Sequence, residues 1–160
     1  MTNASRAGKV LPALLALYWV ASLGHFVHNA EFLAEYPNLP VWLTRGQVYA
    51  AWFGVTGIGV LGYLLVRARY ELFGLVVLGL YAAIGLDGLL HYGRAPMVAH
   101  TVTMNLTIWL EVVAAVLVLV AIASLLGRNG FRRGVHLQVP GHALSARGCG
   151  PCVRYLFRIA

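Results

Sequence analysis

The chain has 160 residues, of which 60% are hydrophobic and 11% are charged, and its mean hydropathy is +0.76. These values are typical of an integral membrane protein and exclude an ordinary soluble domain. The net charge is +7, but the sequence contains no basic segment interleaved with aromatic residues, as nucleic-acid-binding modules have. We therefore expect membrane lipids, and not nucleic acid, as partners.

A membrane-spanning helix needs about 20 mostly apolar residues. Four stretches of the chain meet this requirement, at residues 10–26, 48–66, 72–90 and 102–126. They predict an all-α membrane protein, a four-transmembrane-helix up-down bundle formed by residues 1–127. Residues 128–160 are basic and have no helical period, which predicts a mostly disordered cytoplasmic tail.

The basic residues are divided unevenly between the two sides of the predicted bundle. Ten of the 12 lie on the side of the termini, and Arg45 and Arg94 lie on the other. By the positive-inside rule, both termini are cytoplasmic and the protein is a multi-pass protein of the plasma or inner cell membrane.

The first apolar stretch has two interpretations. It follows a short basic segment, and Ser22 to Gly24 resemble the small-residue cleavage site of a secretory signal. An uncleaved first helix is favoured, because the apolar pattern continues without a break through Phe26 and Phe32.

Polar side chains follow one face of this first helix. Tyr18, Ser22, His25 and Asn29 recur at helical spacing, and His28 lies about 60° away. Two histidines three residues apart lie close enough to share a metal ion. The alternative is a pair of interfacial histidines that are hydrated at the headgroup level.

The connection to the second helix has its own signals. Prolines after Tyr36 predict that the first helix ends near Glu35, with Tyr36 and Trp42 at the headgroup level. Thr44 and Gln47 predict a capping box that opens the second helix. Spaced glycines in the second and third stretches predict close helix packing.

The third stretch ends in Asp87 and His91, and the fourth places His100, Thr107 and Glu111 on one stripe. Asp87 and His91 alone are consistent with a local ion pair. Glu111 is different, because it lies about 12 Å inside its helix. Its side chain must face the bundle interior and have a partner, or be protonated.

Together these residues predict an outward-facing site made of nitrogen and oxygen ligands, which suit a divalent transition metal such as Zn or Fe. The predicted metal ligands are His25, His28, Asp87, His91, His100 and Glu111. Glu111 is also the predicted catalytic residue. The predicted supporting polar residues are Asn29, Glu31, Asn105 and Thr107. A metal-bound water there would serve chemistry or sensing of a lipid-like or small molecule.

Three alternatives stay open: a metal-free proton or solute pathway, a b-type haem electron carrier with histidine axial ligands, and a structural membrane protein without catalysis. No metallopeptidase HExxH motif, His-box motif or nucleophile elbow is present, so whether the chain is an enzyme is undecided. Cys149 and Cys152 copy the CGPC redox tetrapeptide, but the βαβ context that this motif requires is missing.

Overall fold

The structure, a computed structural model, describes residues 3–137, and side chains from Val10 to Arg128. The described chain is entirely helical and contains no strand. Its elements are α1 (Asn3–Glu31), η1 (Leu33–Glu35), α2 (Arg45–Arg67), α3 (Glu71–Ile84), η2 (Asp87–Leu89), α4 (Leu90–Arg94), η3 (Met97–Ala99) and α5 (Val102–Leu137).

Four helical segments of the described chain are long and apolar enough to cross a membrane: Val10–Glu31, Arg45–Arg67, Glu71–Arg94 and Val102–Arg128. The predicted all-α class is therefore confirmed, and the four apolar helices are compatible with the predicted multi-pass membrane protein. The side of the membrane on which each terminus lies, and the membrane itself, stay predictions.

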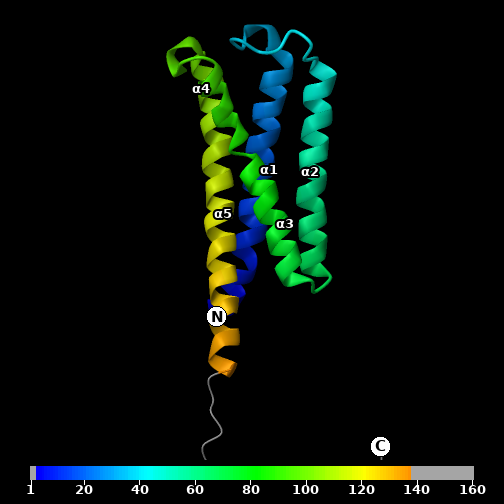
Figure 1. Ribbon diagram of the computed structural model, residues 1–160, viewed down its shortest axis with the longest axis vertical. Coiled ribbons are helices and arrows are strands. Elements are labelled where there is room, and N and C mark those ends of the chain that lie inside the picture. The colour runs from blue at the N-terminus through cyan, green and yellow to red at the C-terminus, as the bar shows by residue number, and fades with distance from the viewer. Residues whose placement is uncertain (1–2, 138–160) are drawn as a thin grey trace, which may run out of the picture.

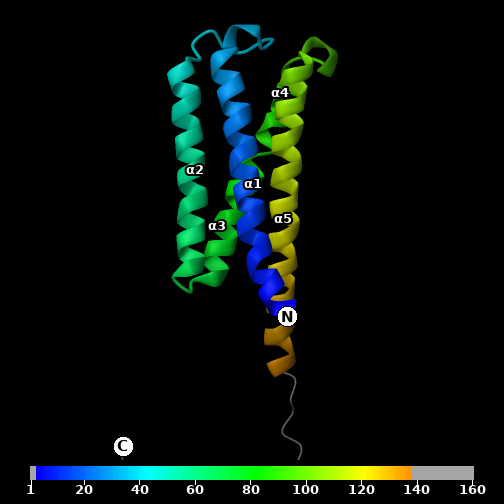
Figure 2. The ribbon, with the colours of Figure 1, turned by 180° about the vertical axis from the view of Figure 1, so that it is seen from behind.

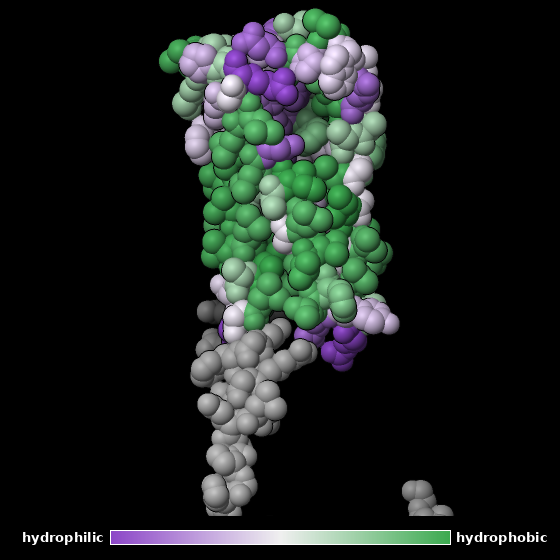
Figure 3. Space-filling view, in the orientation of Figure 1, coloured by the Kyte–Doolittle hydropathy of each residue, from purple (hydrophilic) through white to green (hydrophobic). Residues whose placement is uncertain are grey.

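The outer surface carries a broad hydrophobic belt between two hydrophilic ends (Figure 3). Large apolar side chains on this surface are well exposed, such as Phe53 at 66% and Phe73 at 68%. Apolar exposure on this scale suits contact with lipid and not with water.

Helices α1 and α5 lie side by side, as do α2 and α3 (Figures 1 and 2). Four of the predicted packing glycines lie where another segment leaves no room for a Cβ atom. A Cβ at Gly59 would lie 2.8 Å from the Tyr81 ring, and one at Gly62 would lie 2.9 Å from Leu78. Exposed Gly54 and Gly57 have no such neighbour, so helix packing does not explain them.

The sequence predicted one continuous helix for the third span, but the structure breaks this helix at Gly85. The Gly85 N–H donates to the Ala82 carbonyl at 3.1 Å, three residues back. This leaves the Tyr81 carbonyl free, and it accepts a hydrogen bond from the Tyr18 hydroxyl at 3.2 Å. The Tyr18 ring lies where a Cβ of Gly85 would be, 2.6 Å from Cε2. The inserted tyrosine and the glycine together explain the break.

Of the other predicted helix ends, the start of α2 is confirmed and the end of α5 needs correction. The Thr44–Gln47 capping box is confirmed, with the Gln47 N–H donating to Thr44 Oγ1 at 3.3 Å and Thr44 N–H to Gln47 Oε1 at 2.8 Å. Helix α5 continues to Leu137, past the predicted start of the tail at residue 128. The rest of that tail, including Cys149 and Cys152, lies outside the described residues.

Candidate functional site

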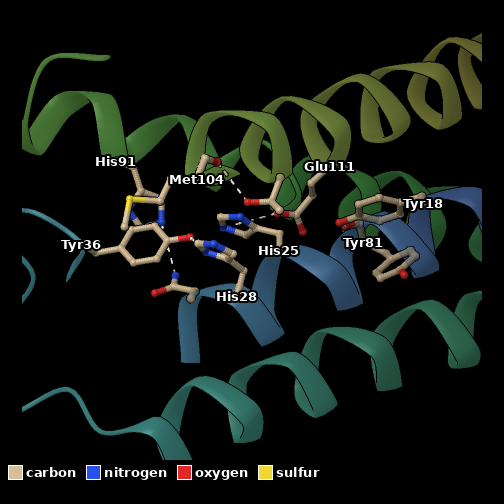
Figure 4. A network of polar contacts seen from close by, with 10 residues as sticks. Tyr18, His25, His28, Tyr36, Tyr81, His91, Met104 and Glu111 are labelled. Atoms are coloured by element: carbon tan, nitrogen blue, oxygen red, sulfur yellow. Dashed lines mark hydrogen bonds and ion pairs between the residues drawn. The ribbon is translucent and has the colours of Figure 1, made fainter. Parts of the chain in front are cut away.

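Polar side chains from α1, α4 and α5 meet inside the bundle, toward the end that holds η1 and α4 (Figures 1 and 4). Within the described chain, the buried polar or charged side chains are Ser22, His25, His91, His100 and Glu111. We call these five residues, together with Asn29, His28 and Tyr36, the polar site. It lies above an apolar core formed by α1, α3 and α5.

The His25–Glu111 pair is the most buried part of the polar site. His25 Nε2 lies 3.7 Å from Glu111 Oε2, and Glu111 is 0% exposed. The prediction that Glu111 faces the interior and finds a partner is therefore confirmed. At 3.7 Å the two atoms lie within ion-pair distance but too far apart for a hydrogen bond.

His91 lies next to this pair because the break in the third span begins a new short helix, α4. Its ring centroid is 5.5 Å from that of His25 and 5.0 Å from that of Tyr36. Asn29 Nδ2 lies 3.4 Å from His91 Nε2. One turn of α1 therefore supplies the neighbours on one side of His91.

Tyr36 is the residue of this site that sequence reasoning misplaced. It is only 4% exposed, instead of lying at the headgroup level, and its hydroxyl is 2.9 Å from His28 Nδ1. Burial raises the pKa of Tyr36 to about 12. The available signal was the Pro-Asn that follows: Asn38 has a φ of 57°, which turns the chain back.

His100 lies at the edge of the site. Its Nδ1 is 3.2 Å from the Pro96 carbonyl, and its ring centroid is 6.2 Å from that of His91. Asn105 supports this corner by donating to the His100 carbonyl at 3.3 Å and accepting from the Tyr92 hydroxyl at 2.8 Å. Thr107 donates to the Met104 carbonyl of its own helix at 3.0 Å.

Two predicted residues point elsewhere. Glu31 is exposed and pairs with Arg45 at 2.9 Å and with the Tyr49 hydroxyl at 2.6 Å, so it lies outside the polar site. Asp87 is also exposed, but its side chain lines a cavity beside the site.

This cavity, of about 180 Å³, lies between α1, α2 and the η2–α4 segment, and we call it the polar cavity. Its polar lining consists of His25, Asn29, Gln47, Asp87 and His91. Within the described chain, no lysine or arginine lines it. Gly88 also lines it, and a Cβ at Gly88 would lie 3.7 Å from Glu111 Oε2. Glu111 therefore lies close behind Gly88.

Many buried polar atoms of the site have no hydrogen-bond partner within the described chain. They are Ser22 Oγ, His25 Nδ1, Asn29 Oδ1, His91 Nδ1, His100 Nε2 and both carboxylate oxygens of Glu111. Unpaired buried polar atoms cost free energy. Seven such atoms belong to this one site, and packing alone does not require them.

The predicted metal site is not supported by this geometry. Among the described residues, no group of three or more His, Cys, Asp or Glu side chains is arranged so that it could hold a metal ion. His28 contacts Tyr36 instead, and His100 lies at the edge of the site against the Pro96 carbonyl. Haem binding stays an untested prediction.

Comparison of the chain with protein-family models, with curated proteins and with solved structures finds no match. The function must therefore be argued from the site itself.

Proposed function

We propose that this multi-pass membrane protein carries an intramembrane acid–base site. In it, Glu111 and His25 exchange a proton with a small molecule that enters the polar cavity. The observation that carries the proposal is the fully buried His25–Glu111 contact at 3.7 Å beside that cavity. Ionisable residues at membrane depth mark proton relays and ligand sites.

The two ring nitrogens of His25 are placed so that they could relay a proton. Its Nε2 faces Glu111, and its Nδ1 has no partner within the described chain, while the residue itself lines the polar cavity. An imidazole can take a proton on one nitrogen and release it from the other. His25 therefore connects the carboxylate to the cavity.

The cost of burying charge favours a His25–Glu111 pair without net charge. An ionised Glu111 alone would be costly to bury. With His25 the pair is either a neutral acid beside a neutral imidazole, or a carboxylate beside an imidazolium. Both arrangements contain the same number of protons and no uncompensated charge. Other titratable groups interact with the pair: they are His28, His91, Asp87, Tyr18, Tyr36 and Tyr81.

Infrared spectroscopy of the purified protein tests the proposal. The protonated-carboxyl band of Glu111 should appear and disappear as the pH is changed, and Glu111→Gln should abolish it. His25→Leu should change its midpoint. Glu71→Gln, at an exposed position on α3, is the matched control and should leave the band unchanged. A band that is the same in Glu111→Gln as in the natural chain defeats the proposal.

Metal analysis of the same samples separates this function from the metal-dependent alternative. We expect less than one metal ion per chain after chelation, with the Glu111 titration unchanged. Stoichiometric Zn or Fe that resists chelation and is lost in His25→Leu would instead establish a metal site. A Soret absorbance band would establish haem.

A further inference from the structure

An apolar groove of about 320 Å³ lies between α1 and α2, which are side by side in Figures 1 and 2. Its lining includes Pro12, Leu15, Trp19, Thr56, Gly59 and Tyr81. Apart from one threonine and the tyrosine hydroxyls, this lining is apolar. The groove therefore suits a hydrocarbon chain.

The groove and the polar cavity follow one another along the same pair of helices. On α1 the groove is lined up to Trp19 and the cavity from His25, roughly 9 Å further along the axis. On α2 the groove is lined by Thr56 and the cavity by Ala51, roughly 7.5 Å away. A single extended molecule is long enough to occupy both spaces.

Trp52 lies between the two spaces. It is one turn from Val48, which lines the cavity, and one turn from Thr56, which lines the groove. Its ring centroid is 5.8 Å from that of Trp19. Trp52 is only 7% exposed, and its Nε1–H has no acceptor within the described chain. Trp52 itself lines neither space, and it marks the level on α2 at which the groove ends and the polar cavity begins.

The polar cavity, in contrast, offers hydrogen-bond acceptors. Asn29 Oδ1 is an unpaired acceptor, and Nδ1 of His25 and of His91 can each accept a hydrogen bond in one tautomer. Asp87 lines the cavity, and no lysine or arginine of the described chain does. An ionised Asp87 repels an anionic head group. A hydroxyl group is uncharged and can donate to Asn29 Oδ1 or to an imidazole nitrogen.

We infer that the groove and the polar cavity form one binding site for a single-chain amphiphile with a small, uncharged, hydroxyl-bearing head group. The head lies in the polar cavity, and the tail lies in the groove. This inference names the ligand class of the proposed acid–base site and rests on that proposal for the polar end.

Tryptophan quenching tests this ligand class. In a Trp42→Phe/Trp109→Phe background, the described fluorophores are Trp19 and Trp52, both beside the groove. The probe is a monoacylglycerol brominated in the middle of its chain, added to the protein in maltoside micelles. We expect saturable quenching that unbrominated monoacylglycerol reverses. Equal quenching by a brominated phosphatidylcholine, or stronger quenching by a brominated fatty acid, would overturn the inference.

A matched pair of variants tests the groove without disturbing the packed core. Ala16 is exposed and lines the groove, and Ala13 is exposed but does not line it. Ala16→Phe should weaken monoacylglycerol binding by about tenfold, and Ala13→Phe should not. Equal affinities in these two variants would contradict a tail in the groove. Asn29→Leu should weaken binding of monoacylglycerol but not change the Ala16→Phe effect.

The quenching and infrared results are independent. A titrating Glu111 band without saturable quenching overturns the ligand and leaves the acid–base proposal. Saturable quenching without a titrating Glu111 band overturns the acid–base proposal and leaves the ligand.

Discussion

His25 Nε2 and Glu111 Oε2 lie 3.7 Å apart between α1 and α5, at a level where both side chains are almost inaccessible. These helices pack along much of their length (Figures 1 and 2). A buried pair of this kind offsets the cost of burying each member, but it adds little net stability over an uncharged pair of similar shape.

Glu111→Gln should therefore preserve the melting temperature of the detergent-solubilised protein, or raise it. The amide keeps the shape of the side chain, and His25 can stay neutral, so no buried charge is stranded. Thermal unfolding measures this, with Glu31→Gln at the exposed Arg45 contact as the control. If Glu111→Gln instead lowers stability by roughly 1–3 kcal/mol, the pair is structural and not functional.

Gly85→Ala should destabilise the bundle by roughly 1–3 kcal/mol, because its Cβ would overlap the Tyr18 ring. Gly79→Ala is the matched control in the same span, since the atom nearest to its Cβ would be 3.9 Å away. That substitution should be neutral or slightly stabilising, because alanine favours helix. Denaturant or thermal unfolding of the two variants distinguishes them. Equal stability would show that Tyr18 does not require the glycine.

Folding stability should decline in alkaline solution through Tyr36. Burial raises its pKa from the usual value near 10 to about 12. The folded state thus favours the protonated phenol, so this contribution is complete below about pH 10 and is lost as the pH rises toward about 12. The measurement is thermal unfolding at about pH 9 and about pH 11. The loss should be smaller in Tyr36→Phe, and an identical loss in both proteins would contradict the assignment.

Asn38 should tolerate glycine better than alanine. Its φ of 57° is costly for alanine, and its side-chain amide donates to the Arg94 carbonyl at 2.8 Å. Asn38→Ala loses both features and should cost about 2–3 kcal/mol, whereas Asn38→Gly loses only the hydrogen bond, about 1 kcal/mol. Unfolding of the two variants gives the comparison. If they are equally stable, the backbone conformation is unimportant.

The membrane spans and the inward position of Glu111 could be predicted from the sequence, because hydrocarbon imposes two strict conditions. A span needs a minimum apolar length, and a carboxylate deep inside it must avoid lipid. The Thr44–Gln47 capping box was predictable for a similar reason, since helix starts have local chemistry.

The geometry of the polar site was not predictable to the same degree. The break at Gly85 depends on Tyr18, a residue in another helix, and it interrupts the helix before Asp87 and His91. The sequence predicted that Asp87 and His91 lie on one face of a continuous helix, but the break interrupts the helical period between Gly85 and His91. Tyr36 enters the site through a loop whose fold depends on a contact between Asn38 and Arg94. Such long-range contacts leave no periodic signal in the sequence.

The break at Gly85 also separates two mechanical units in the third span. Below it, α3 is fixed in the apolar core, while α4 above it is connected through the short η2 turn and is tied by Asn38 to the α1–α2 loop. The upper part of the third span is therefore positioned by the α1–α2 loop, and the lower part is positioned by the apolar core.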